Sequence, residues 1–220
     1  MTVLVTGATG NVGGEVARLL VRDGVHVRAL VRDVSRARAV PDEAEIMVGD
    51  YGHPKSLATA LDGVDCLFMV CLAEPAPGRL VKHRNVVQAA RRVGVKHLAY
   101  LSFLRPSPQA GFPQARWHAD TEAVIDDAGI PRTFLRASLY QTSLLTTAGI
   151  VDRGRLLAPA RQGRVAAVAR EDVAAVAAAT LCGPPPAAGR AAHDVTGPEL
   201  LSWHDIADLV GAATDRKSVV

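Results

Sequence analysis

The chain has 220 residues, 49% hydrophobic and 21% charged, which excludes a disordered protein and allows one sizeable core. The net charge of +3 is spread along the sequence without a run of five Lys or Arg residues, so nucleic-acid binding is not indicated. The cysteines lie in apolar stretches without metal-ligand spacing, which predicts small buried side chains, a reducing compartment and no metal site: Cys66, Cys71 and Cys182.

Membrane targeting is not expected either. No uncharged apolar run reaches about 18 residues, and the N-terminus lacks the basic region of a signal peptide. We therefore expect a cytoplasmic protein without a membrane span.

The opening stretch, M-T-V-L-V-T-G-A-T-G-N-V-G-G, predicts a strand, a glycine-rich turn and a helix that begins at Asn11. Gly7 would allow a turn that a Cβ obstructs, and Gly13 would let the helix pack closely on the strand. Gly10 would let the backbone approach a pyrophosphate, which the free N–H groups of the helix N-terminus attract. The stretch predicts dinucleotide binding, although its spacing is G-x-x-G-x-x-G and a plain tight turn is the alternative.

Strand and helix patterns then alternate. Predicted strands lie at 25–31, 44–48, 65–72, 97–101 and 133–136. Predicted helices begin at Pro54 and span 80–93 and 114–128. Further along, the pattern predicts a strand at 164–169, a helix at 171–181, a short strand at 192–195 and a last helix capped by Ser202 and Asp205.

This alternation predicts an α/β fold with a doubly wound parallel sheet, because parallel strands require crossover helices. We expect a single NAD(P)-binding Rossmann-type domain over 1–220. Residues 1–136 would form the dinucleotide-binding core and 137–220 a smaller substrate-side segment, since ligands bind beyond the carboxyl ends of the strands.

Arg32 follows the second predicted strand, where proteins of this fold contact the ribose. An acid there suits NAD(H), whereas a guanidinium suits the 2′-phosphate of NADP(H). One charge-assisted hydrogen bond contributes about 1.5–3 kcal/mol, so Arg32 predicts roughly 10- to 100-fold preference for NADP(H) over NAD(H). Asp33 could oppose this preference, and a solvated surface arginine is the alternative interpretation.

Residues after the third and fourth strands would complete the cofactor cleft. Asp50 could accept a hydrogen bond from the adenine amino group and Tyr51 could stack on the ring, with a simple helix-entry turn as the alternative. Val70 and Cys71 would pass under the adenosine and ribose, where buried packing is the alternative role.

Several sequence motifs follow one another in a characteristic order: T-G-A-T-G-N-V-G at 6–13, V-R-D at 31–33, G-D-Y-G-H-P-K-S-L at 49–57, L-D-G-V-D at 61–65, R-N-V-V-Q-A-A at 84–90, G-V-K-H-L-A-Y-L-S at 94–102 and G-I-P-R-T-F-L-R at 129–136. Together they resemble the NmrA-like branch of the atypical short-chain dehydrogenases/reductases, and within it NADPH-dependent quinone oxidoreductases and triphenylmethane-dye reductases. The resemblance covers about residues 1–213. It implies NADP(H) binding and a C-terminal portion that faces the nicotinamide.

The resemblance also implies roles for individual residues. Arg32 would bind the 2′-phosphate, and Asp50 and Tyr51 the adenine. The residues that would line the pyrophosphate are Gly7, Thr9, Gly10, Asn11 and Val12.

The chain departs from alcohol-oxidising relatives because it lacks their Tyr-x-x-x-Lys pair after the fifth strand. Its literal match, Tyr51 to Lys55, lies after the third strand and is interrupted by Pro54. An unactivated ketone needs a proton donor, whereas a quinone, azo dye or triarylmethyl cation already spreads the incoming charge. The absence of the pair therefore favours conjugated acceptors and disfavours epimerisation.

Two other residues are candidates for catalysis. Ser102 would meet the nicotinamide edge or a substrate oxygen, and His118 could donate a proton to a quinone oxygen. A turn-bonding serine and an exposed helix histidine are the alternatives. After Arg136 the family usually has Pro and a downstream Asn, but here Ala137 and Gln141 stand nearby, which puts carboxamide contacts in doubt.

The sequence therefore supports two functions from different classes. The first is NADPH-dependent reduction of a small quinone-like or dye-like hydride acceptor, in which the protein supplies positioning. The second is a non-catalytic NADP(H)-binding redox sensor of the NmrA type. The sequence leaves a homodimer open.

Overall fold

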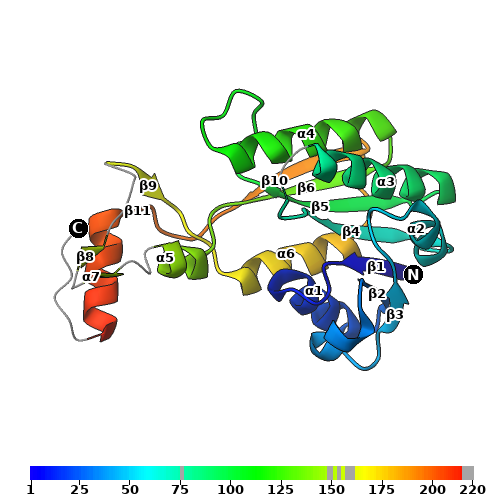
Figure 1. Cartoon of the computed structure of the whole chain (residues 1–220), viewed down its shortest axis with the longest axis horizontal. Coiled ribbons are helices and arrows are strands. Elements are labelled where there is room, and N and C mark those ends of the chain that lie inside the picture. The colour runs from blue at the N-terminus through cyan, green and yellow to red at the C-terminus, as the bar shows by residue number, and fades with distance from the viewer. Residues whose placement is uncertain (75–76, 148–150, 153–154, 157–161, 215–220) are drawn as a thin grey trace. The chain divides into compact units, whose positions relative to one another are not determined.

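The computed structural model describes residues 1–74, 77–147, 151–152, 155–156 and 162–214 (Figure 1). The chain divides into two compact units, Met1–Arg136 with Glu171–Asp194, and Ala137–Arg170 with Val195–Val220.

The first unit alternates strands with helices, as the apolar pattern predicts. Its elements are β1 (Thr2–Thr6), α1 (Asn11–Arg22), β2 (His26–Val31), the 3₁₀ helix η1 (Val34–Ala39), β3 (Glu45–Val48), α2 (Pro54–Leu61), β4 (Cys66–Val70), α3 (Gly78–Val93), β5 (His97–Phe103), α4 (Pro113–Ala128), β6 (Arg132–Ala137), α6 (Arg170–Cys182) and β10 (Arg190–Val195).

Seven strands form one sheet in the order β10-β6-β5-β4-β1-β2-β3. β1 pairs in parallel with both β2 and β4, so the chain builds outward from β1 on one side and then crosses to the other. This reversal is the switch point at which open α/β sheets bind ligands. The predicted doubly wound α/β fold is confirmed.

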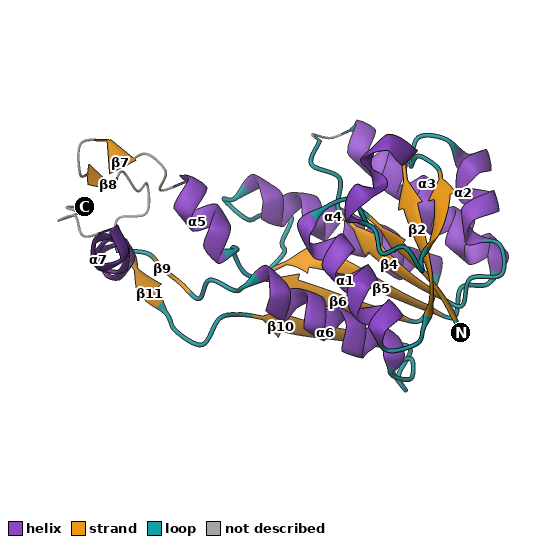
Figure 2. Ribbon diagram, turned by 90° about the horizontal axis from the view of Figure 1, so that it is seen from below, coloured by secondary structure: helices purple, strands orange, loops and turns teal. Residues whose placement is uncertain are grey.

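Helices cover both faces of the sheet. α1 and α6 lie on one face and α2, α3 and α4 on the other (Figure 1), and Figure 2 shows α1 and α6 in front of the strands. Under α2, α3 and α4 a core cluster contains Leu4, Leu57, Leu67, Val86 and Tyr100, all of which are fully buried. Two buried faces explain the nearly continuous apolar runs of the central strands.

The glycine turn forms as predicted at two positions. Gly7 has a φ of +64°, which an L side chain rarely adopts. A Cβ on Gly13 would lie 2.3 Å from the Gly7 carbonyl oxygen and 2.9 Å from that of Thr6. The absence of a side chain at Gly13 therefore sets how closely α1 approaches β1.

The second unit contains α5 (Gln141–Thr147), β7 (Val151–Asp152), β8 (Arg155–Leu156), β9 (Arg164–Val165), β11 (Leu201–Ser202) and α7 (Trp203–Thr214). β9 pairs antiparallel with β11, and β7 with β8. A small cluster of Leu144, Ala167, Trp203, Ile206 and Ala207 forms its core. The predicted cap is confirmed, since Ser202 Oγ accepts from the Asp205 N–H at 3.2 Å and the Asp205 carboxylate accepts from the Ser202 N–H at 2.7 Å.

Two local predictions were wrong, and one element was not predicted. The strand predicted at 164–169 comprises only Arg164–Val165, because the chain after it turns to make a single bridge between Val168 and Tyr140. The segment Val34–Ala39 forms an unpredicted 3₁₀ helix. Cys182 is exposed rather than buried, since it ends α6, whereas Cys66 is buried and Cys71 half-buried.

Of the helices that the structure describes, none is both long and apolar enough to cross a bilayer.

Replacing Gly13 by Ala is expected to lower the free energy of unfolding by about 3 kcal/mol, because the new Cβ must displace backbone atoms. Gly111→Ala is the matched control, since a Cβ there meets no atom within 4 Å. Urea unfolding of both variants measures the difference. Equal stability of the two variants would show that α1 does not need this close approach.

Candidate cofactor and acceptor site

A pocket opens where β1, β2, β3 and β4 end, beside the switch point of the sheet. Seven residues predicted to bind the cofactor line it: Gly7, Thr9, Arg32, Asp50, Tyr51, Val70 and Cys71. The other lining residues are Leu30, Val31, Gly49, Leu72, Glu74 and Lys82. The strand order thus brings together residues that lie far apart in the sequence.

A second hollow adjoins the glycine turn and is lined in part by Thr9, Gly10 and Asn11. No side chain caps the N-terminus of α1, whose N-cap is Gly10, so the first N–H groups of the helix are free for an anion. Val12 lines neither hollow, because its side chain is buried on the inner face of α1. A contact of Val12 with a ligand would have to use its backbone.

The side chains of Arg32 and Asp33 lie in different surroundings. Arg32 lines the pocket and is exposed. The Asp33 carboxylate accepts a hydrogen bond from the Ser35 N–H at 2.9 Å and caps η1, and its interactions with the Ser35 side chain and N–H lower its pKa. Asp33 is therefore engaged in the turn rather than in the pocket lining.

The floor of the pocket is a hydrogen-bonded group around Thr6. Thr6 Oγ1 accepts from the Tyr51 hydroxyl at 2.7 Å and from the Val70 N–H at 2.9 Å, and donates to the Phe68 carbonyl at 3.1 Å. Burial raises the pKa of Tyr51, so its hydroxyl stays a donor. Tyr51 thus ties the loop after β3 to β1 and β4.

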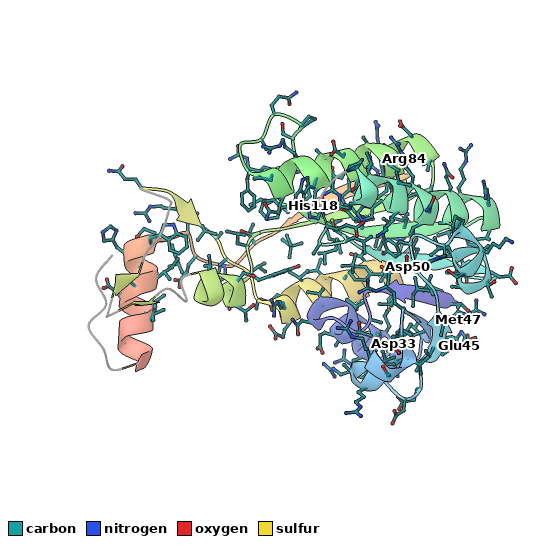
Figure 3. All side chains as sticks on the ribbon, viewed as in Figure 1. Asp33, Glu45, Met47, Asp50, Arg84 and His118 are labelled. Atoms are coloured by element: carbon teal, nitrogen blue, oxygen red, sulfur yellow. The ribbon has the colours of Figure 1, made fainter. Side chains whose placement is uncertain are left out.

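Asp50 lies at the rim of the same pocket. Its carboxylate accepts from the Gly52 N–H at 2.6 Å, and its own N–H donates to Ser56 Oγ at 3.2 Å. Figure 3 shows Asp50 and Asp33 near β2 and β3, well separated from His118 on α4.

Two charged lining residues were missed at the level of sequence. Lys82 Nζ on α3 lies 2.9 Å from Glu74 Oε2, in the segment after β4. The residues are eight apart and Glu74 lies outside the described helices and strands, so no helical or strand spacing indicated that they would meet.

A cluster of polar side chains lies in the interior between α3 and α4. His83 Nε2 accepts from the Leu72 N–H at 3.1 Å, so the neutral ring carries its hydrogen on Nδ1, which lies 2.9 Å from Thr121 Oγ1. Burial, reinforced by Arg79 and His118, lowers the pKa of His83 to about 3. His83 is therefore a neutral structural connector.

Arg79 is the charged side chain of this interior that lacks hydrogen bonds in the described part of the chain. Its side chain is fully buried, and its three guanidinium nitrogens have no hydrogen-bond partner among the described residues. The guanidinium lies 3.7 Å from the Asp120 carboxylate and 4.9 Å from the centre of the Trp117 ring. Its charge opposes protonation of the neighbouring histidines.

His118 on α4 belongs to a group of aromatic side chains that includes Phe103 at the end of β5. Its Nδ1 lies 2.9 Å from the Tyr100 hydroxyl, and its ring stacks on Phe103 with centroids 6.1 Å apart. Burial and then Arg79 lower the pKa of His118 to about 4, so the ring is neutral at pH 7. It is half-buried rather than an exposed helix histidine.

Ser102 lies at the end of β5 and is buried. Its hydroxyl donates to Glu122 Oε1 on α4 at 2.6 Å. Neither Ser102 nor His118 lines the two hollows above. In the part of the chain that the structure describes, no group of three metal-ligating side chains gathers.

Comparison with known proteins decides the family. A family model described as NAD(P)H-binding matches residues 7–184. The chain belongs to this NAD(P)H-binding family. The resemblance to NmrA-like, atypical short-chain dehydrogenases/reductases is confirmed by its relatives.

Three relatives in this family are similar over most of the chain. The NAD(P)H azoreductase of Xenophilus azovorans is 32% identical over 216 residues, covering 97% of this chain and 74% of its own. The triphenylmethane reductase of Citrobacter sp. superposes with a TM-score of 0.87 at 30% identity, covering 100% of this chain and 77% of its own. The NADPH-dependent quinone oxidoreductase of Escherichia coli, solved with NADPH, gives 0.89 at 29% identity with the same coverage.

Acidification is expected to destabilise the protein through His83. The unfolded chain protonates this residue below its ordinary pKa of 6.5, whereas the folded chain keeps it neutral down to about pH 3. Its contribution is therefore complete above pH 6.5 and is lost as the pH falls, by up to about 1.4 kcal/mol per pH unit.

Urea unfolding at pH about 7.5 and about 5 measures this loss. His83→Gln is the comparison, because an amide can accept from the Leu72 N–H and donate to Thr121 without titrating. The variant should lose less stability than the wild type. An equal loss in both proteins would assign the acid sensitivity to other groups.

Proposed function

We propose that this family member is an NADPH-dependent reductase that transfers hydride to conjugated acceptors of the quinone or dye type. The pocket at the switch point carries the proposal, because the cations Arg32 and Lys82 and the glycine turn meet there. The three relatives named above act, by their names, on azo compounds, triphenylmethane dyes and quinones. These acceptors share an extended electrophilic π-system.

The residues present suit a phosphorylated dinucleotide. The positive φ of Gly7 and the uncapped start of α1 leave backbone N–H groups for a pyrophosphate. Arg32, exposed at the end of β2, offers a guanidinium for the 2′-phosphate, while Asp33 is held by Ser35. When bound, NADPH supplies the hydride.

The surroundings of His118 suit a flat acceptor. The Phe103 and Phe112 rings have centroids 5.4 Å apart, and Phe112 is 44% exposed. Aromatic rings attract a planar π-system in offset or edge-to-face geometry. α4 lacks a Tyr-x-x-x-Lys pair, so the site lacks the usual donor to an alkoxide and favours acceptors that delocalise charge.

His118 would assist the acceptors that need a hydrogen bond. In the tautomer in which Nδ1 accepts from the Tyr100 hydroxyl, the neutral ring carries its hydrogen on Nε2. That N–H can donate to the quinone oxygen on which negative charge develops. A triarylmethyl cation becomes neutral on gaining hydride and has no such requirement.

Steady-state NADPH oxidation with a panel of quinones, azo dyes and triarylmethyl dyes tests the proposal. We expect turnover with at least one class. Tight NADPH binding without consumption across the panel would instead identify a redox sensor.

Arg32→Ala is expected to weaken NADPH binding about tenfold or more and to leave NADH binding nearly unchanged, through loss of one charge-assisted contact. Titration of both cofactors by calorimetry measures the two affinities. Asp33→Asn is the matched control, because Asp33 caps η1 and should not change the preference. Equal losses for NADPH and NADH would show that Arg32 does not contact the 2′-phosphate.

His118→Gln is expected to lower kcat for a quinone by about 100-fold while leaving kcat for a triarylmethyl cation within a few-fold, because only the quinone oxygen gains negative charge. Turnover of both acceptors at saturating NADPH measures the split. A parallel loss with both acceptors would indicate that His118 only supports the fold of the site.

A further inference from the structure

The hydroxyl of Ser102 is held in an unusual environment for a residue at the end of a central strand. Ser102 is 3% exposed and donates to Glu122 Oε1 at 2.6 Å. Glu122 is itself buried on the inner face of α4, at 7% exposure. A serine hydroxyl has one hydrogen, so this bond uses its whole capacity as a donor.

Arg136 on β6 fixes the orientation of the carboxylate. Its Nε donates to Glu122 Oε1 at 3.0 Å and its Nη2 to Glu122 Oε2 at 2.7 Å. The contact pairs both carboxylate oxygens with an always-charged guanidinium, and the hydrogen bonds to Glu122 raise the pKa of Arg136. An ionised carboxylate can only accept, so the Ser102 hydrogen cannot reverse its direction.

The sheet register places Ser102 beside the cofactor pocket. Val70 on β4 is paired with Leu101 on β5, so the next residues along the two strands are Cys71 and Ser102. Cys71 lines the pocket. Ser102 thus lies one strand beyond the pocket, on the side away from Arg32 and β2.

We propose that Glu122, held by Arg136, is a positioning residue that makes Ser102 an obligate hydrogen-bond acceptor for the carboxamide N–H of the nicotinamide. This inference rests on the proposed function, because it requires a bound dinucleotide. It deepens that function by naming the end of the cofactor that the serine orients.

The chemistry of the two ligands distinguishes them. A nicotinamide carboxamide offers N–H donors, whereas a quinone offers only carbonyl oxygens. If the Ser102 oxygen presents only lone pairs, it attracts the carboxamide N–H and repels a quinone carbonyl oxygen. The same arrangement leaves Ser102 unable to donate to an alkoxide, which agrees with acceptors that delocalise charge themselves.

The test compares NADP⁺ with its 3-acetylpyridine analogue, which has no amide N–H. Calorimetry gives the two Kd values and hence the preference for NADP⁺ of each protein. In the wild type we expect a preference of about 3- to 10-fold, the range of one net hydrogen bond. Ser102→Ala should remove it, and Ser102→Thr, which keeps a hydroxyl, should retain it.

Glu122→Met tests the positioning role, because Met has similar length but cannot accept the serine hydrogen. The freed hydroxyl can then donate to the acetyl oxygen, so the preference should fall toward one. Asp126→Met is the matched control: Asp126 also lies on α4 and pairs with an arginine on β6, Arg132, but does not contact Ser102.

Each outcome bears on the proposal. An unchanged preference for NADP⁺ in both Ser102→Ala and Glu122→Met would overturn it. An equal fall of this preference in Asp126→Met would also overturn it, because any ion pair between α4 and β6 would then have the same effect. If Glu122→Met does not fold, the two Ser102 variants still decide whether the serine accepts from the amide. Failure of the wild type to bind NADP⁺ would instead overturn the proposed function and remove the basis of this inference.

Discussion

The close approach of α1 to β1 is the constraint on which the site depends. A Cβ on Gly13 would lie 2.3 Å from the Gly7 carbonyl oxygen, so no other residue fits there without moving the backbone. The turn between β1 and α1 is therefore short, and it places the uncapped N-terminus of α1 beside the end of β1. The sheet order places the ends of β2, β3 and β4 next to the end of β1, and the pocket forms at these four strand ends.

Much of this arrangement could be predicted from the sequence, because apolar periodicity and glycine spacing are local signals. Seven of the predicted cofactor residues meet in one pocket, since parallel strands end at the same edge. The partners of these residues could not be predicted. Asp33 turns to Ser35, Lys82 meets Glu74, and Glu122 meets Ser102, and each pairing depends on a loop path or a helix rotation that spacing does not determine.

The interior between α3 and α4 is more polar than the apolar pattern suggests. His83 bridges the Leu72 N–H to Thr121, and the Arg79 guanidinium lies over Trp117 without a hydrogen bond in the described part of the chain. A buried cation of this kind is costly for stability unless it is compensated. Burial, reinforced by the charge of Arg79, lowers the pKa of His83 and His118, so both rings are neutral at pH 7 and act as hydrogen-bond donors and acceptors rather than as acids.

The hydroxyl of Thr6 has its capacity filled by the protein itself, since it accepts twice and donates once. These bonds join β1, β4 and the loop after β3 before any ligand arrives. Entry of a ligand therefore requires no ordering of the floor, and little entropy is lost there on association. Ligands that differ only in the groups above this floor should enter with similar association rate constants and differ mainly in their residence times.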